Sequence, residues 1–324
     1  MVIYWSISYI FLKYPLLLHQ KKNKLKLPPK KDDHSHYILA HRGGSVENPE
    51  NTLQAFKHAL EQGVQFLETD LRLTKDGILM TLHDDNFNRL SNVNKKVEEM
   101  NYKDQPKILD EIPMHFTKDY KLKLTEKHDK SFTTLEQLFS SIPSEIVVQI
   151  ELKDQDNFEQ HRKTVELIQK YKRQATTIIG VQKDVFNRQL HSLDPSIPKF
   201  VSMSNAIKYL GAYVVGLLPF IDIYEDVASL PFMTRDFHKM RINESQSFTK
   251  YFFIYGVKFF NIVSEPFLRH LNARGIFTNY WVLNEEDEFQ YLTNSCVQGI
   301  MTDKPSMAVR ILKENSMKHQ KKQQ

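Results

Sequence analysis

Short apolar segments alternate along the chain with longer amphipathic ones, and this alternation predicts strands and helices in turn. Nine runs after residue 36 have the length and composition of strands, and they are residues 37–41, 65–71, 78–83, 146–152, 176–180, 199–203, 257–262, 276–283 and 299–301. Strands separated by helical stretches are typical of a parallel sheet with crossover helices.

The second and third of these runs are the exception to the alternation. Only the turn Thr74-Lys75-Asp76-Gly77 separates them, whereas a parallel connection needs about a dozen residues, so the two must form a hairpin. Eight parallel strands remain. The sequence therefore predicts a TIM-type (β/α)8 barrel, a fold of about 250 residues, within the 324-residue chain.

Two stretches interrupt the regular pattern. Residues 85–132 are polar and rich in Lys and Asn, which predicts an insertion of low regularity, and residues 204–256 form an apolar insertion. The latter contains the apolar run 209–221, which is too short to span a bilayer but long enough to enter one membrane interface or to form a buried helix.

The N-terminus is apolar first and basic second. Residues 1–18 are apolar apart from Lys13, and a Lys-rich segment from Lys21 to Lys31 follows. A secretory signal has the opposite order, so we expect an uncleaved membrane anchor with the lysines on the cytoplasmic side, where they can also meet anionic lipid. The alternative is an apolar first helix that packs on the barrel.

The expected organisation of the whole chain has four parts. They are an anchor over residues 1–18, a basic linker over 19–36, the barrel over 37–312 and a basic tail over 313–324.

Charge and cysteine content exclude some classes of function. The net charge of +5 comes from the two ends, because residues 1–31 carry seven Lys and no acid and residues 313–324 carry four Lys and one Glu. The body between them is acidic, which argues against nucleic-acid binding. Cys296 is the single cysteine, so the chain needs neither an oxidising compartment nor a thiolate zinc site.

Three carboxylates are expected at one end of the barrel. Glu68 and Asp70 are two residues apart on one predicted strand and therefore share a face, and Glu151 ends the next parallel strand. Converging acids repel one another unless a cation lies among them, and oxygen ligands alone favour Mg²⁺ or Ca²⁺ over zinc. The alternative is that the three residues are salt-bridged strand ends.

Two histidines end strands in the same way. His41 precedes Arg42 at the end of the first strand, and His83 follows the hairpin strand. A pair of imidazoles can take a proton from a nucleophile and return one to a leaving group, and an arginine offers a planar fork to a phosphate. These parts suit phosphodiester cleavage, although a single buried histidine is more often a core residue.

These residues belong to a series of motifs along the chain. In the order and type of these motifs, the chain resembles the glycerophosphodiester phosphodiesterase family. The motifs are His41-Arg42-Gly43, Pro49-Glu50-Asn51-Thr52, Glu68-Thr69-Asp70, Thr74-Lys75-Asp76-Gly77, His83-Asp84, Glu151-Leu152-Lys153, Trp281-Val282-Leu283-Asn284 and Gly299-Ile300-Met301-Thr302-Asp303-Lys304-Pro305. Residues 12–20, 217–221 and 281–286 are most similar to the membrane-anchored branch that acts as a lysophospholipase D.

The resemblance implies a barrel of the phosphatidylinositol phospholipase C type with a small insertion after the second strand. It also implies roles for nine residues: His41 and His83 are the general acid and base, Glu68, Asp70 and Glu151 bind one divalent cation, Arg42, Glu50 and Lys153 assist at the phosphate, and Trp281 lines the pocket.

The expected activity is hydrolysis of lysoglycerophospholipids to lysophosphatidic acid and a headgroup alcohol such as choline or ethanolamine. Two alternatives remain: hydrolysis of water-soluble glycerophosphodiesters, and a catalytically silent membrane scaffold that binds lipid headgroups. We expect contact with membrane through the N-terminus and through 209–221 if that run meets lipid, in the endoplasmic reticulum or another endomembrane with the barrel facing the cytosol.

Overall fold

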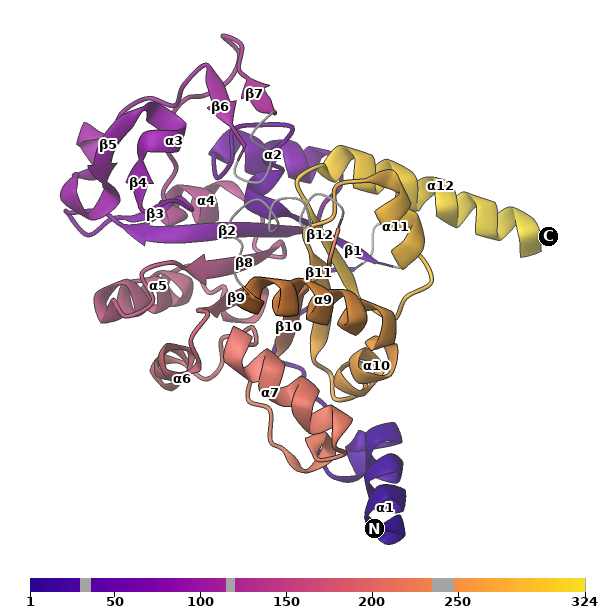
Figure 1. Cartoon of the computed structure of the whole chain (residues 1–324). Coiled ribbons are helices and arrows are strands. Elements are labelled where there is room, and N and C mark those ends of the chain that lie inside the picture. Colours follow the sequence, from indigo (N-terminus) through magenta and orange to yellow (C-terminus); the bar gives the residue numbers. More distant parts are fainter. Residues whose placement is uncertain (30–35, 115–119, 235–247, 324) are drawn as a thin grey trace.

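Eight parallel segments form a nearly closed barrel. A computed structural model describes residues 1–29, 36–114, 120–234 and 248–323. The main sheet has the order β10-β11-β12-β1-β2-β8-β9. Its strands are β1 (Tyr37–Ala40), β2 (Phe66–Leu73), β8 (Val147–Leu152), β9 (Thr177–Gly180), β10 (Val227–Pro231), β11 (Phe277–Trp281) and β12 (Gly299–Thr302). Parallel bridges from Ile179 to Lys199 and from Phe200 to Val227 join β9 to β10 and supply the eighth position. The predicted barrel is thus confirmed in its main features (Figure 1).

Helices cover the outer face of the sheet. They are α2 (Leu53–Glu61), α4 (Leu135–Ser141), α5 (Phe158–Lys170), α6 (Asp184–Leu193), α7 (Met203–Val214), α9 (Phe248–Val263), α10 (Glu265–Ala273), α11 (Glu286–Leu292) and α12 (Pro305–Gln323). Leu67 and Leu71 of β2 pack outward in the main apolar core, whereas Phe66 packs inside the barrel. This alternation leaves Glu68 and Asp70 on the inner side, as predicted from the period of a strand.

One predicted strand is wrong, and another was missed. Residues 257–262 belong to helix α9, in which Ile254, Val257 and Phe260 are buried at a spacing of three. A short apolar run cannot be assigned to helix or strand by hydrophobicity alone. The actual strand is β10, which interrupts its apolar residues with Ser229 and ends in Pro231. Residues 204–256 are therefore part of the barrel and not an insertion, although 235–247 lie outside the described residues.

The hairpin and the insertion after it form a small lobe. β3 (Leu79–Thr81) pairs antiparallel with β2, as predicted. Residues 85–132 are more regular than expected, with β4 (Asn86–Phe87), α3 (Asn88–Ser91), β5 (Val93–Lys96), β6 (Glu111–Pro113) and β7 (Lys121–Lys123). They enclose a separate apolar cluster that includes Phe87 and Phe132. Residues 115–119 of this segment are outside the described residues.

The N-terminal helix lies beside the barrel. α1 (Val2–Lys13) has 12 residues, a length of about 18 Å at the usual rise, against a bilayer core of about 30 Å. In the part of the chain that the structure describes, no helix has both the length and the apolar character needed to cross a membrane. α1 contacts η6 (Leu218–Phe220) through the rings of Phe11 and Phe220, 5.9 Å apart. The packed-helix alternative describes this contact, and the membrane anchor stays a prediction.

The basic linker lies against the bottom of the barrel. The Lys22 amide donates to the Arg274 carbonyl at 2.9 Å, and the Lys26 amide donates to the Ala175 carbonyl at 2.8 Å. The ammonium groups of Lys22 and Lys24 lie 3.7 and 3.8 Å from the buried carboxylate of Asp226. These two lysines therefore face the protein. Residues 30–35 lie outside the described residues, and the expected tail from 313 continues helix α12.

Candidate active site

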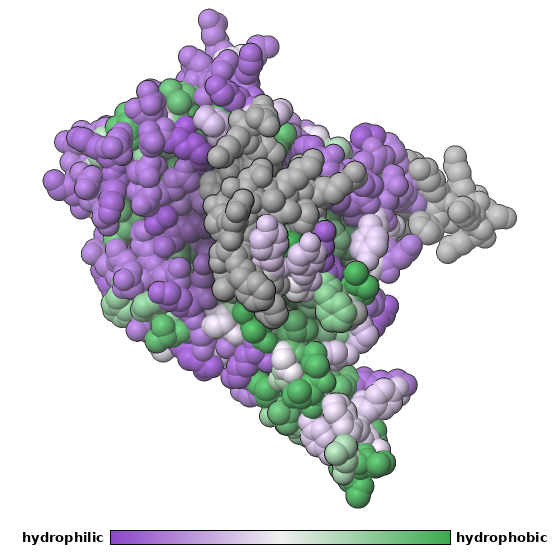
Figure 2. All heavy atoms as spheres, in the orientation of Figure 1, coloured by the Kyte–Doolittle hydropathy of each residue, from purple (hydrophilic) through white to green (hydrophobic). Residues whose placement is uncertain are grey.

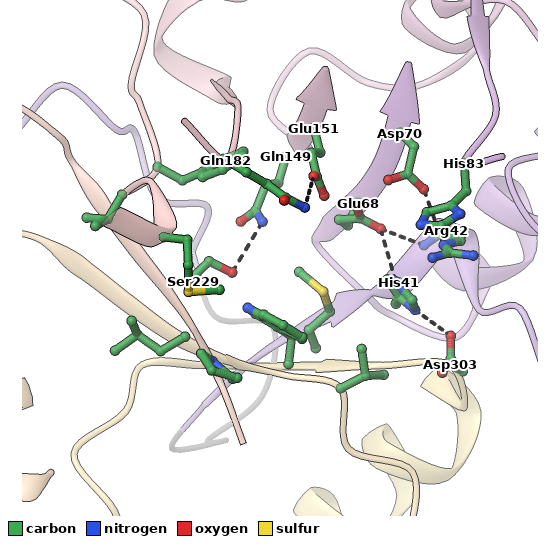
Figure 3. A pocket seen from close by; sticks show the side chains of 18 of the residues that line it. His41, Arg42, Glu68, Asp70, His83, Gln149, Glu151, Gln182, Ser229 and Asp303 are labelled. Carbon is green, nitrogen blue, oxygen red and sulfur yellow. Dashed lines mark hydrogen bonds and ion pairs between the residues drawn. The ribbon is translucent and has the colours of Figure 1, made fainter. Parts of the chain in front are cut away.

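A pocket of about 350 Å³ opens at the carboxyl ends of the strands. Eight of the nine sequence-predicted site residues line it, namely His41, Arg42, Glu68, Asp70, His83, Glu151, Lys153 and Trp281. Figure 3 shows that β1, β2 and β8 bring the charged side chains to one side of the pocket. The ninth residue, Glu50, lies behind Arg42.

His41 is held by an aspartate that we did not assign from sequence. Its Nδ1 lies 2.6 Å from Oδ1 of Asp303, and its Nε2 lies 4.0 Å from Oε2 of Glu68. Asp303 also accepts hydrogen bonds from Ser45 and from Asn284. Burial disfavours the charged imidazole, but the carboxylate of Asp303 outweighs burial and raises the pKa of His41 above its ordinary value. Asp303 stood in a quoted motif, and its place beside His41 follows only from the pairing of β12 with β1.

His83 has its own carboxylate partner. Its Nδ1 lies 2.8 Å from Oδ1 of the adjacent Asp84, which in turn accepts a hydrogen bond from Nε of Arg89 at 2.7 Å. Burial, followed by the nearby charge of Arg42, lowers the pKa of His83. The two imidazoles thus sit in environments that shift their pKa values in opposite directions.

Arg42 lies in a tight turn that aims both its backbone and its side chain at acids. Its φ of 51° is in the left-handed region, an uncommon conformation for a residue with a side chain that clusters at functional sites. The amide donates to Glu68 at 2.9 Å, and the guanidinium contacts Glu50 at 3.0 Å and Asp70 at 3.2 Å. Gly43 follows with φ of 81°, where a Cβ would come 2.8 Å from Cβ of Ala55. The turn therefore needs a glycine at this position.

Glu50 acts on the pocket through arginines. Its carboxylate accepts hydrogen bonds from Arg42 and, at 2.7 Å through both terminal nitrogens, from Arg89. Burial raises the pKa of Glu50, but the charges of Arg89 and Arg42 outweigh burial and lower it to about 2. Arg89 comes from α3 of the insertion, so the small lobe contributes to the site. Sequence reasoning missed Arg89, because its contact with Glu50 joins residues 39 positions apart.

The ammonium of Lys153 lies between two of the three predicted metal ligands. Asp70 and Glu151 are register partners on β2 and β8, and the ammonium of Lys153 lies 3.0 Å from Asp70 and 2.9 Å from Glu151. Burial and the charge of Asp70 raise the pKa of Glu68 to about 7. Among the described residues, no three His, Cys, Asp or Glu side chains are grouped closely enough to hold a metal ion. Carboxylate oxygens are the type of ligand that a hard cation prefers. In this structure the ammonium of Lys153 supplies the positive charge between Asp70 and Glu151.

The other side of the pocket is apolar. Among the residues of this apolar side, the sequence predicted only Trp281. The residues that it did not predict include Phe200, Val201, Met203, Leu230 and Pro231. Phe200 belongs to the eighth barrel position, and Leu230 and Pro231 end β10, the strand that the sequence pattern missed. A polar end that suits a phosphate thus adjoins an apolar wall that suits a hydrocarbon.

The sequence matches a described family over most of its length. The profile of the Glycerophosphoryl diester phosphodiesterase family matches residues 41–307. The human protein named Lysophospholipase D GDPD1 is 31% identical over 303 residues, which cover 94% of this chain and 92% of the human one. The mouse protein named Lysophospholipase D GDPD3 is 29% identical, over 94% of this chain and 87% of that protein.

Solved structures share the fold. A putative glycerophosphoryl diester phosphodiesterase from Silicibacter pomeroyi superposes with a TM-score of 0.62 at 16% identity, covering 88% of this chain and 96% of that one. A phosphodiesterase from Oleispira antarctica in complex with the product sn-glycerol-3-phosphate superposes with a TM-score of 0.59 at 18% identity, covering 86% and 96%. These likenesses confirm the barrel.

Proposed function

The chain belongs to the glycerophosphoryl diester phosphodiesterase family, and from this premise we propose that it is a metal-dependent lysophospholipase D that releases the headgroup alcohol and leaves lysophosphatidic acid. The observation that carries the proposal is the two-sided pocket. A glycerophosphodiester needs only the polar end, whereas a substrate with an acyl chain also needs the apolar wall formed by Phe200, Leu230 and Trp281.

The polar end contains the groups that phosphodiester hydrolysis requires. Arg42 and Lys153 place positive charge beside the phosphate, where it stabilises the negative charge that develops on the phosphoryl oxygens. His41 and His83 form the acid and base pair: one accepts a proton from the attacking hydroxyl, and the other donates a proton to the departing alcohol oxygen. Asp303 and Asp84 orient the two rings by holding Nδ1 of each.

Glu68, Asp70 and Glu151 are the residues that would hold the Mg²⁺ or Ca²⁺ ion. Such an ion polarises phosphoryl oxygens and lowers the pKa of a bound hydroxyl. Their oxygen-only chemistry and the pairing of β2 with β8 support this assignment. Lys153 contacts two of the three carboxylates, so an ion between them would compete with its ammonium.

The N-terminal segment supports a membrane location. α1 and η1 (Pro15–Leu17) expose large apolar side chains, including Ile3, Tyr9 and Leu17. We infer that residues 1–18 attach the protein to an endomembrane, such as that of the endoplasmic reticulum, with the barrel on the cytosolic side. Protection of the barrel from protease in sealed microsomes would contradict this orientation.

The alternative substrate is a water-soluble glycerophosphodiester, because the polar end forms a complete set of groups without the apolar wall. Choline release from lysophosphatidylcholine and from glycerophosphocholine, each with Mg²⁺, Ca²⁺ or chelator, separates the two hypotheses. Metal-dependent release from the lysolipid that Glu68→Ala abolishes supports the proposal. Choline release from glycerophosphocholine alone supports the water-soluble substrate. If neither substrate is hydrolysed, and substrates with other headgroups are not hydrolysed either, the lipid-binding scaffold is the remaining hypothesis.

A further inference from the structure

We propose that the exposed face of helix α7 is a path along which the acyl chain of a lysolipid passes between a lipid leaflet and the pocket. This inference rests on the proposed function, since it names how that substrate reaches the site. It assigns a role to residues that lie outside the charged end of the pocket.

The path is an apolar stripe along α7. Met203, Ile207, Leu210 and Val214 are spaced by four, three and four residues, which places them on one side of the helix. Met203, Ile207 and Val214 are 38%, 66% and 68% exposed. The opposite side of α7 packs on the core through Tyr209 and Ala212. Leu210 is partly buried against the core, and the three large apolar side chains that are exposed on this side of α7 mark a surface with a ligand or partner.

The first end of the stripe is in the pocket wall. Met203 and Ala206 line the pocket, and the same wall contains Leu230 and Pro231 from the end of β10. A hydrocarbon that lies on Ile207 can therefore continue over Met203 without crossing a polar surface. The charged residues that would hold the phosphate lie on the other side of the same pocket (Figure 3).

The second end of the stripe meets the N-terminal helix. The hydroxyl of Tyr4 donates a hydrogen bond to the carbonyl of Val215. The indole of Trp5 lies against Gly216, where a Cβ would be 3.1 Å from the ring. Figure 1 shows α7 running from the barrel to α1, and Figure 2 shows hydrophobic residues gathered over that part of the molecule. The proposed membrane-binding segment and the pocket are thus the two ends of one apolar surface.

Length and charge identify the occupant. The eleven steps from Met203 to Val214 span about 16 Å at 1.5 Å per residue, and one leaflet of a bilayer core is about 15 Å thick. Residues 203–221 contain Lys208 and no Asp or Glu. A single acyl chain drawn from one leaflet therefore fits the stripe in length, and an anionic lipid surface is not repelled.

Gly211 offers a test that keeps the fold. It is exposed beside the stripe, one turn after Ile207, and a Cβ there meets nothing within 4 Å. Because glycine is a poor helix former, both Gly211→Ala and Gly211→Glu should fold. Gly211→Glu places a charge beside the path, and Gly211→Ala is its matched control. Phe158→Glu, at an exposed position of α5 that does not line the pocket, is the control for an added acid.

Turnover is compared on glycerophosphocholine and on long-chain lysophosphatidylcholine in phosphatidylcholine vesicles. We expect Gly211→Glu to lower kcat/KM on the long-chain substrate about tenfold, the effect of about 1.4 kcal/mol, and to leave glycerophosphocholine turnover unchanged. Gly211→Ala and Phe158→Glu should change neither. Unchanged long-chain turnover in Gly211→Glu, or an equal loss on both substrates, would overturn the path and leave the proposed function standing.

A binding measurement tests the acyl-chain path even if the protein does not hydrolyse the lysolipid. The chain has two tryptophans, so Trp5→Phe leaves Trp281 in the pocket wall as the only one. Lysophosphatidylcholine with a brominated acyl chain should quench Trp281 fluorescence, and Gly211→Glu in this background should weaken the quenching about tenfold in lipid concentration. Absence of quenching, or a monomer–dimer shift that Gly211→Glu abolishes, would overturn the lipid path in favour of no ligand or a second copy of the chain.

Discussion

Asp303 Oδ1 lies 2.6 Å from Nδ1 of His41 and directs the other ring nitrogen of that histidine toward Glu68. The two residues are 262 positions apart, and the pairing of β12 with β1 brings them together. Ser45 and Asn284 hold the carboxylate in turn. One imidazole of the proposed acid and base pair is therefore fixed in orientation by a residue at the end of β12.

Replacement of Asp303 by Asn keeps the shape of the side chain and removes its charge. Because a neutral amide neither fixes the same ring tautomer nor stabilises an imidazolium, kcat should fall by about 10² to 10⁴, with little change in KM. The pKa of His41 should also fall, which moves the limb of the pH profile that depends on it toward lower pH. Initial rates of choline release across pH test this, and Ser45→Ala, which keeps the carboxylate, is the control. Unchanged rates would remove Asp303 from the mechanism.

Arg89 joins the small lobe to the site, so its loss should affect both stability and rate. Arg89→Met leaves Glu50 and Asp84 without a shared partner, and breaking a buried ion pair costs about 3–5 kcal/mol. It should also lower kcat, because Asp84 then holds His83 less firmly. Urea unfolding and rates on glycerophosphocholine are the measurements. Arg162→Met, which breaks an exposed pair with Glu166, should cost under about 1 kcal/mol; equal costs for the two variants would contradict the argument.

Glu50 should make the stability of the fold sensitive to acid. Its pKa is lowered from 4.5 to about 2, so its ionised form stabilises the native state above about pH 4.5 and this contribution is lost as the pH falls toward 2. The contribution is about 3 kcal/mol. Glu50→Gln should be less stable at neutral pH and should lose less stability between pH 5 and 2. Urea unfolding at several pH values tests this, with exposed Glu61→Gln as the control. An unchanged slope in Glu50→Gln would refute it.

Metal binding should depend on Glu151 more than on nearby surface acids. Glu151→Gln removes one of the proposed oxygen ligands and leaves Lys153 with Asp70, so we expect at least about tenfold weaker binding of Mg²⁺ or Ca²⁺. Calorimetric titration with the metal salt alone, and the metal concentration that half-restores activity after chelation, are the two measurements. Glu159→Gln on the surface of α5 serves as the control. Full activity after exhaustive chelation would rule out the proposed cation.

Trp5 reports directly on the membrane proposal. In Trp281→Phe, Trp5 is the only tryptophan, and it is 47% exposed on α1. Addition of phospholipid vesicles should shift its emission to shorter wavelength, and brominated phospholipids should quench it, because an indole at the interface leaves water. The same vesicles without lysolipid should not quench Trp281 in Trp5→Phe. Emission of Trp5 that is unchanged by vesicles would contradict attachment through residues 1–18.

Strong local patterns in the sequence were sufficient to predict a hairpin and the direction of side chains on a strand. The hairpin of β2 and β3 follows from a connection too short for a parallel crossover, and the inward direction of Glu68 and Asp70 follows from the two-residue period of a strand. Ordered motifs placed eight of nine expected residues in one pocket. The pattern failed between residues 199 and 262, where apolar runs fit helix and strand equally well and the true strand β10 is interrupted by Ser229.

The amino-acid sequence by itself determined the class of fold, the residues of the charged end and the family, because these depend on local periodicity and on ordered motifs. Tertiary structure decided which groups act on one another. Asp303 reaches His41, Arg89 reaches Glu50 and α7 joins the pocket to α1 only after strands and helices far apart in the chain are packed together. Such contacts arise from the closure of the barrel and from the packing of the small lobe and α1 beside it, and no local pattern encodes them.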